Sequence, residues 1–243
     1  AALAYVLGTV MAAIYGLLVW YRSMAPHQAE PRLDRDALWQ SSSKLWVMSL
    51  IEGAFLPWAP LFFLGLWAST AESGVFGAVT RIAMLVSFFL TAVNTVMVPK
   101  FAQMRESGDM AGLERLARRM SLIVTLVNAP IFLIMIFGSG WLMGLFGPDF
   151  TTGGLALSIV ALGQVVNTVS GASGYLLMLA GHERDIRSAA FVGAVIMAAA
   201  VLTLIPAHGL LGAAIAHAAA ITGMGLCKAA YVRSRLGILV VPG

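Results

Sequence analysis

Seven long apolar stretches run through the chain, and they constrain its fold more than any other feature. Each contains 18 residues or more, and an α-helix needs roughly 20 mainly apolar residues to cross about 30 Å of hydrocarbon. Inside lipid the backbone must satisfy its own hydrogen bonds, which favours helices. The stretches are Leu3–Trp20, Leu45–Ala68, Ile82–Pro99, Met120–Phe137, Leu155–Ala180, Ala189–Ala207 and Leu210–Cys227. They predict an all-α fold, a polytopic transmembrane helix bundle with about seven membrane-spanning helices.

The low content of charged residues agrees with a membrane location. Only 11% of the 243 residues are charged and 60% are hydrophobic, whereas a soluble domain carries about 25% charged residues. A soluble fold of this composition would expose large apolar patches and aggregate. The net charge of +4 does not indicate nucleic acid as a partner, because the cations lie in short loops where anionic lipid headgroups explain them.

The cationic side chains predict the topology. Fourteen of the 15 lysines and arginines lie after the first, third, fifth or seventh stretch, and the alternate loops contain none. By the positive-inside rule the cationic loops face the cytoplasm. The N-terminus of the chain is then outside and the C-terminus is cytoplasmic. Arg81 is the one exception. The other cations are Arg22, Arg32, Arg35, Lys44, Lys100, Arg105, Arg115, Arg118, Arg119, Arg184, Arg187, Lys228, Arg233 and Arg235.

The motifs of common enzyme classes are missing from the sequence. There is no His-Glu-x-x-His zinc motif, no Gly-x-Ser-x-Gly nucleophile elbow and no glycine-rich phosphate loop with a lysine. The single cysteine, Cys227, has no second thiol with which to hold a metal. We therefore expect no enzyme activity, no metal site and no cofactor.

Glu52 stands out among the few polar residues inside the apolar stretches. An ionisable residue at the bilayer centre costs about 2.5–3.5 kcal/mol and is a functional candidate by default. At 1.5 Å per residue, Glu52 reaches a depth similar to that of Asn94, Asn128 and Asn167. These asparagines, together with Gln164, predict a polar belt at mid-depth. Without a cation nearby, burial favours the neutral carboxyl, so Glu52 either couples transport to protons or hydrogen-bonds an asparagine as a helix contact.

Arg81 and two prolines are further candidates. Facing inward, the Arg81 guanidinium would bind phosphate in a bidentate geometry; facing outward, it would extend to the lipid headgroups. Pro57 and Pro60 lie three residues apart in the second stretch. Each removes a backbone donor, which predicts a bend whose inner face lines a cavity, although isolated prolines are also tolerated in membrane helices. We interpret His217 as a hydrogen-bonded packing residue rather than a proton carrier.

The segment Asp109–Arg119 has an amphipathic pattern. Leu113, Leu116 and Met120 share one face of the expected helix, and the arginines lie elsewhere. The pattern suits a helix that lies on anionic lipid, and a solvated connector is the alternative interpretation.

Four segments resemble one transporter family. They are Gly74–Ile82 (GVFGAVTRI), Val98–Gln103 (VPKFAQ) followed by Gly108-Asp109, Phe146–Phe150 (FGPDF), and Leu204–Ala216 with its Leu-Ile-Pro and Gly-Ala-Ala elements. In order and spacing they resemble the polysaccharide or oligosaccharide flippases of the O-antigen type. That family belongs to the multidrug/oligosaccharidyl-lipid/polysaccharide exporter superfamily. The resemblance covers about Leu45 to Gly237.

The resemblance implies a fold and a division of the chain. Members of the family have about twelve helices in two lobes around a central cavity. This chain resembles the sixth helix plus the C-terminal lobe, so a missing N-terminal lobe is an implied partner. We expect a transmembrane helix at 1–21, a cytoplasmic connector at 22–43, a six-helix lobe at 44–237 and a tail at 238–243.

The resemblance also implies a function. The protein would flip lipid-diphosphate-linked oligosaccharide repeat units from the inner to the outer leaflet of a bacterial inner membrane by alternating access. Implied partners are membrane lipids, a polyprenyl-diphosphate-linked oligosaccharide, a polymerase and glycosyltransferases. The substrate-binding candidates are Arg81, Asn94 and Asn167, and the coupling or gating candidates are Glu52, Pro57 and Pro60.

Two other functions remain open at this point. One is a multidrug exporter of the same superfamily, which would require acidic residues in its cavity to attract cationic drugs; Glu52 is the only deep one. The other is a non-transporting membrane subunit of a glycan-synthesis complex, which the prolines and the polar belt disfavour.

Overall fold

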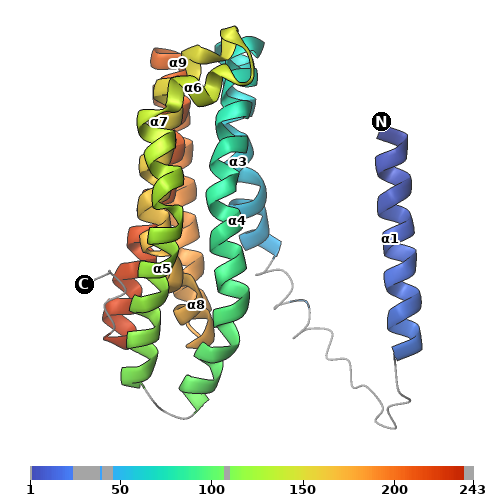
Figure 1. Ribbon diagram of the computed structural model, residues 1–243, viewed down its shortest axis with the longest axis vertical. Coiled ribbons are helices and arrows are strands. Elements are labelled where there is room, and N and C mark those ends of the chain that lie inside the picture. The colour runs from blue at the N-terminus through green and yellow to red at the C-terminus, as the bar shows by residue number, and fades with distance from the viewer. Residues whose placement is uncertain (1, 24–38, 40–45, 107–109, 238–243) are drawn as a thin grey trace. The chain divides into compact units, whose positions relative to one another are not determined.

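The computed structural model describes residues 2–23, 39, 46–106 and 110–237 (Figure 1). The side chain of Asn94, most of the predicted connector 22–43 and the predicted tail 238–243 lie outside the described residues. The chain divides into two units, Ala1–Lys44 and Leu45–Gly243.

The first unit contains helix α1 (Ala2–Ser23), which includes the whole of the first apolar stretch. Every side chain from residue 10 to 20 is exposed, among them the large apolar Ile14, Leu17 and Trp20. A helix with so many exposed apolar side chains is suited to lipid or to another protein segment, because these side chains are unfavourable in water.

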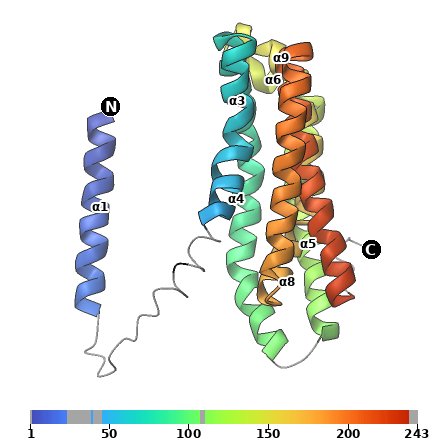
Figure 2. The same cartoon turned by 180° about the vertical axis from the view of Figure 1, so that it is seen from behind.

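The described part of the second unit consists of helices joined by short turns (Figures 1 and 2). A helix that begins at Trp46 passes through a π-helical segment, η1, into α3. The elements are η1 (Leu50–Phe55), α3 (Leu56–Trp67), α4 (Thr70–Glu106), α5 (Met110–Phe137), α6 (Ser139–Gly144), the 3₁₀ segment η2 (Pro148–Gly153), α7 (Gly154–Val169), α8 (Gly171–Leu179) and α9 (Glu183–Leu236).

Five helices in the described part are long and apolar enough to cross a membrane. They are Trp46–Trp67, Thr70–Phe88, Gly112–Phe137, Pro148–Leu179 and Glu183–Leu236. The last has 54 residues and folds back on itself, so it supplies two passes. The predicted all-α polytopic bundle is confirmed, and the protein is a multi-pass membrane protein.

The fold-back occurs at Gly209, whose φ of 51° and ψ of −124° are not helical. Positive φ is accessible to glycine at little cost because it has no Cβ. On either side of the break the two halves of α9 lie against each other: Gly193 lies against Met224, and Asp185 pairs with Arg235 at 3.0 Å. The members of each pair lie at similar distances in sequence before and after Gly209, which is the pattern of an antiparallel helical hairpin.

Two further residues shape this hairpin. A Cβ at Gly212 would lie 2.1 Å from the Leu204 carbonyl oxygen, so only glycine fits there. The Glu72 carboxylate accepts a hydrogen bond of 2.7 Å from the Leu210 backbone N–H. This N–H begins the second half of α9 and has no helical partner of its own. The break at Gly209 and these contacts give a structural reason for the Gly-x-x-Gly spacing at 209–212.

Helix α4 begins earlier than the apolar stretch Ile82–Pro99 predicts. The Ser69 hydroxyl accepts the Glu72 N–H at 3.1 Å, an N-cap contact that starts the helix at Thr70. The Ser-x-x-Glu spacing of Ser69 and Glu72 is a capping signal in the sequence. Arg81 consequently lies three turns inside α4 rather than at its end.

The loops that lack cations gather at one end of the bundle, near α6 in Figure 1. Glu72 bonds Leu210, and Gly153 of η2 lies against Val75 of α4. When successive helices cross a membrane, every second loop lies on the same side. The charge pattern therefore requires the loops without cations to share one end of the bundle.

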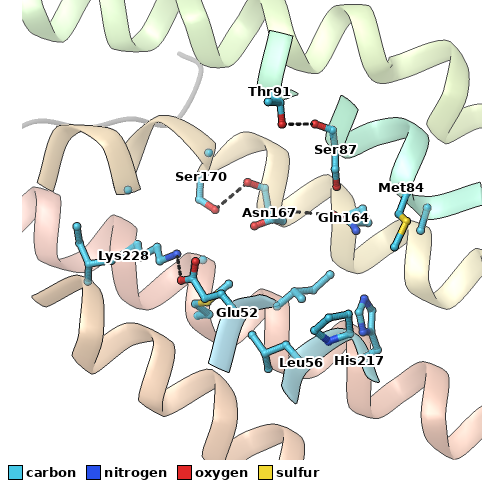
Figure 3. Close-up of a pocket in the computed structure, with 18 of the residues that line it drawn as sticks. Glu52, Leu56, Met84, Ser87, Thr91, Gln164, Asn167, Ser170, His217 and Lys228 are labelled. Carbon is cyan, nitrogen blue, oxygen red and sulfur yellow. Dashed lines mark hydrogen bonds and ion pairs between the residues drawn. The ribbon is translucent and has the colours of Figure 1, made fainter. Parts of the chain in front are cut away.

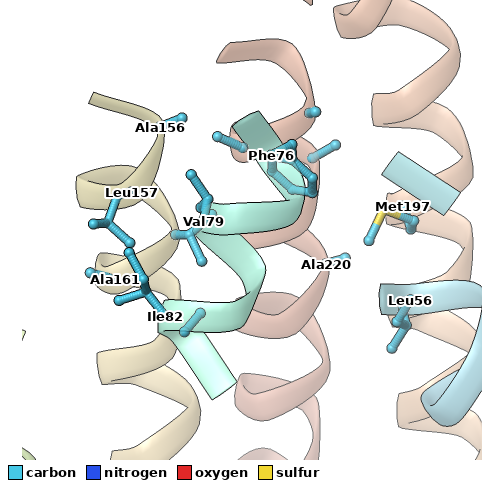
Figure 4. Packing of buried hydrophobic residues seen from close by; sticks show 14 of the residues in the cluster. Leu56, Phe76, Val79, Ile82, Ala156, Leu157, Ala161, Met197 and Ala220 are labelled. Carbon is cyan, nitrogen blue, oxygen red and sulfur yellow. The ribbon is translucent and has the colours of Figure 1, made fainter. Parts of the chain in front are cut away.

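Alanine is frequent where the helices meet, alongside larger buried residues, and many large apolar residues face outward. The core shown in Figure 4 contains Ala156, Ala161 and Ala220 beside Phe76 and Val79. Exposed large residues include Phe88, Leu126, Leu133, Phe191 and Leu202. Lipid supplies no hydrophobic force between helices, so close backbone approach at small residues holds such bundles together.

The apolar face of the amphipathic segment is buried in protein, so neither interpretation of it, a helix on the lipid surface or a solvated connector, describes that face. From Met110 onward the segment forms the first turns of α5. Leu113 and Met120 are 4% and 1% exposed and pack against Leu176, Leu177 and Val232. The same periodicity suits lipid or a protein neighbour, and in this fold α8 and α9 supply the neighbour.

Candidate functional site

A cavity of about 530 Å³ opens among the helices of the second unit (Figure 3). Its volume lies within the range of roughly 300–1,000 Å³ that is usual for small-molecule sites. Its described polar lining residues come from η1, α4, α7, α8 and α9: Glu52, Thr80, Ser87, Thr91, Gln164, Asn167, Ser170, Tyr175, His217 and Lys228. A cavity of mainly apolar lining with several convergent polar groups is the default candidate for a functional site.

The π-helix η1 forms one wall of the cavity and carries Glu52. Pro57 follows it, and a proline ring collides with the carbonyl four residues earlier, here that of Gly53. The wider π turn relieves this collision: the Leu56 N–H donates to the Ile51 carbonyl, five residues back. Such single π turns occur often at functional sites. Pro57 lines the cavity beside Glu52, whereas Pro60 is buried inside α3 and is absent from the described lining.

A second helix break, between α7 and α8, forms another wall. The helix is interrupted at Ser170, and the Ser121 hydroxyl donates to the Val169 carbonyl at 2.7 Å. A Cβ at Gly225 would lie 2.6 Å from the Ser170 hydroxyl, so a glycine allows α9 to approach the break. Interrupted helices are common at transporter binding sites, because they bring free backbone groups to a cavity.

Glu52 forms an ion pair with Lys228, contrary to the expectation that it has no cation nearby. The distance from Lys228 Nζ to Glu52 Oε1 is 2.8 Å (Figure 3). The Lys228 side chain is 15% exposed and the Glu52 side chain is 33% exposed. The sequence interpretation placed Lys228 in a loop after the seventh stretch, but α9 continues to Leu236. Lys228 therefore lies two turns inside the helix, and its ammonium removes the reason to expect a neutral Glu52 carboxyl.

The predicted polar belt is only partly assembled. Asn167 Nδ2 donates to Gln164 Oε1 at 3.3 Å, and both amides line the cavity with Glu52. Asn128 is fully buried elsewhere, where its Nδ2 bonds the Val124 carbonyl of its own helix. It is not among the lining residues. The side chain of Asn94 lies outside the described residues, so its place in the belt stays a prediction.

His217 joins the second half of α9 to the proline segment. Its imidazole hydrogen-bonds the backbone of Leu56. The Leu56 N–H is already used by Ile51, and Pro60 offers no N–H to the Leu56 carbonyl. The imidazole therefore satisfies a carbonyl that the second proline leaves without a helical donor. His217 Nδ1 is buried and has no hydrogen-bond partner among the described atoms.

The side chain of Arg81 is exposed and is absent from the described cavity lining. A side chain that binds a substrate inside the cavity has to be among the residues that line it. An exposed guanidinium is available to lipid or to a second lobe, and its assignment to substrate stays a prediction.

The sequence interpretation missed Lys228 as a cavity residue, and it did not single out the lining residues Thr80, Ser87, Thr91, Ser170 and Tyr175. The interpretation of His217 as a hydrogen-bonded packing residue agrees with its burial and its bond to Leu56. A signal for Lys228 was present: the apolar residues Ala229, Tyr231 and Val232 continue the helix beyond it. No group of three or more His, Cys, Asp or Glu side chains in the described part is placed to hold a metal ion.

Comparison with curated proteins supplies two relatives, both from the archaeon Haloferax volcanii. The chain is similar to flippases. It is 24% identical over 197 residues to the probable low-salt glycan biosynthesis flippase Agl15. These residues make up 81% of this chain and 42% of the relative. It is 25% identical over 163 residues to the probable flippase AglR, covering 65% and 34%. The chain thus spans less than half the length of either relative.

No family model and no solved structure matches the chain. The two relatives are named as transporters rather than enzymes. They agree in kind with the family that the sequence motifs resemble, without showing the O-antigen type or the C-terminal half.

Proposed function

We propose that the protein that carries this chain flips lipid-diphosphate-linked oligosaccharides from the inner to the outer leaflet. In this proposal the described bundle is the C-terminal lobe of a two-lobe, about twelve-helix transporter, and an N-terminal lobe is its partner. The glycan flippase among the relatives supports the substrate class. Membrane lipids, a polymerase and glycosyltransferases remain proposed partners.

The observation that carries this proposal is the cavity between interrupted helices, into which a set of polar side chains converges. A bundle that only scaffolds other proteins has no need of a 530 Å³ cavity with such polar groups among its apolar helices. Each polar group there costs free energy in the membrane unless it is bonded. A substrate with hydroxyl groups offers that bonding.

The proposed mechanism is alternating access, in which one lobe rocks against the other. The π segment and Pro57 form a weak point in the helix that carries Glu52, because they lack part of the regular hydrogen-bond ladder. In the proposal the Glu52–Lys228 pair links this segment to α9 in one state and opens in the other. In the neighbouring turn His217 bonds the Leu56 carbonyl, which Pro60 leaves without a helical donor.

The Glu52–Lys228 pair weighs against an exporter of cationic drugs. Such a site needs a carboxylate that is free to attract a cation. The only carboxylate among the described lining residues is Glu52, and Lys228 already neutralises it.

Reconstitution tests the proposal. The complete protein is placed in liposomes with a fluorescent lipid-linked oligosaccharide, and dithionite bleaches the label in the outer leaflet. We expect bleaching to proceed from about half to nearly all of the label when the protein is active. A variant with Asn167→Leu in the cavity should block flipping, and Asn128→Leu, at a buried site outside it, is the matched control. Equal bleaching with and without protein would refute the proposed function.

The proposed orientation has the N-terminus outside and the C-terminus in the cytoplasm. A cysteine introduced at Asp149 should react with an impermeant reagent in intact cells, and one at Arg115 should not. The reverse pattern would overturn the orientation. The bacterial inner membrane stays a prediction, because both relatives are archaeal.

A further inference from the structure

The charges that line the cavity cancel each other. Glu52 and Lys228 are the only Asp, Glu, Lys or Arg residues among its described lining, and they pair at 2.8 Å. A site built for a diphosphate needs an excess of cationic groups, since charge-assisted bonds provide most of the binding. This cavity has no such excess, and the exposed Arg81 does not line it.

The remaining polar groups are uncharged and occur as both donors and acceptors. Asn167 donates to Gln164 Oε1, which leaves the Gln164 amide N–H₂ and Asn167 Oδ1 without a protein partner in the described lining. The Ser170 and Thr91 hydroxyls donate to backbone carbonyls and keep acceptor capacity. Glu52 has a second carboxylate oxygen. These are the groups that hydrogen-bond hydroxyls.

His217 lines the cavity without offering its second nitrogen to it. The residue is 8% exposed and is among the lining residues. Its Nδ1 is enclosed by protein and has no partner in the described part of the chain. The hydrogen-bonding capacity of the cavity therefore comes from the amides, the hydroxyls and the ion pair.

We propose that this cavity binds the uncharged sugar portion of the lipid-linked glycan, and that the diphosphate is held outside it. This inference rests on the proposed function and specifies which part of the substrate the cavity takes. The Glu52–Lys228 pair acts as a neutral hydrogen-bonding unit for sugar hydroxyls. The amides of Gln164 and Asn167 on α7 complete the set.

Two lipids distinguish the sugar from the diphosphate. The first is the lipid-linked glycan that accumulates in cells from which the gene is deleted, and the second is a polyprenyl diphosphate of the same chain length without sugar. The Kd of each is measured on the complete protein in nanodiscs. We expect the glycan lipid to bind at least about tenfold more tightly, as one or two net hydrogen bonds imply.

The double variant Gln164→Ala/Asn167→Ala tests the amides. We expect its affinity for the glycan lipid to fall about tenfold and its affinity for the bare diphosphate to change less than twofold. Asn128→Leu, a buried asparagine outside the cavity, should alter neither Kd. An equal loss for both lipids would overturn the sugar assignment while leaving the flippase proposal in place.

A second variant tests the ion pair directly. Glu52→Gln/Lys228→Met removes both charges and keeps the cavity neutral. If the variant weakens binding of the bare polyprenyl diphosphate, Lys228 is a phosphate ligand and the inference is wrong. If the wild-type protein binds no glycan lipid at all, or no such lipid accumulates after gene deletion, the flippase proposal itself fails.

Discussion

The helix interruptions of this bundle are of two kinds, one enclosed by protein and one that lines a cavity. At Gly209 the break is enclosed, because the Glu72 carboxylate accepts the Leu210 N–H, and Gly212 brings the following turn against the Leu204 backbone. The breaks at the π segment and at Ser170 line the cavity, and there Ser121 and His217 bond the backbone while the amides of Gln164 and Asn167 face the same space. Protein side chains satisfy the backbone at both kinds of break, and only the second kind places further polar side chains beside a cavity.

Gly212 should be the most sensitive position at the enclosed break. A Cβ there would overlap the Leu204 carbonyl, so Gly212→Ala forces the backbone of the hairpin apart. We expect a loss of about 3 kcal/mol or more, at the upper end of the cost of overpacking, and poor recovery of folded protein. Thermal unfolding in detergent, followed by tryptophan fluorescence, measures the change. Gly74→Ala, where nothing lies within 4 Å of the added Cβ, is the control and should not destabilise.

Glu72→Ala should weaken the enclosed break by about 2 kcal/mol, because it removes a charged acceptor from the Leu210 N–H. Glu72→Gln keeps a carbonyl oxygen in the same place and should recover at least half of that loss. If alanine and glutamine behave alike, the hydrogen bond does not hold the hairpin. The same thermal unfolding measurement applies.

Lys228→Met should cost about 1–2 kcal/mol, which is less than the roughly 3–5 kcal/mol for a fully buried pair because Glu52 keeps partial solvent contact. Removing both charges with Glu52→Gln/Lys228→Met should recover most of that stability. A double-mutant cycle gives the coupling free energy. A coupling near zero would show that the pair does not join η1 to α9.

Ser121→Ala should have the smallest effect, about 1 kcal/mol, because it removes one hydroxyl donor from the Val169 carbonyl at the α7–α8 break. Thr125 lies one turn further along α5, and its hydroxyl is buried with no partner among the described atoms. Thr125→Val is therefore the matched control and should be neutral or slightly stabilising. Identical changes at both positions would contradict a role for Ser121 in supporting the break.

Most of the helices could be predicted from the sequence, and most of the site could not. Each of the seven apolar stretches overlaps a helix in the described residues. The exact start of α4 was missed because the apolar window ignores the cap at Ser69. In the site, Glu52 and Asn167 were recognised as polar residues at depth, but Lys228 was assigned to a loop and Asn128 to the polar belt. Residue spacing gives depth along a helix, and it does not give the direction in which a neighbouring helix lies.

The sequence by itself determined the solvent and the secondary structure of this protein. Apolar length and the scarcity of charge leave lipid as the only medium for these helices, and lipid requires the backbone to bond internally. Only the tertiary structure decided which polar groups meet. Glu52 and Lys228 are 176 residues apart, and Glu72 and Leu210 are 138 apart. Contacts at such separations depend on how small residues let particular helices approach, which no local pattern encodes.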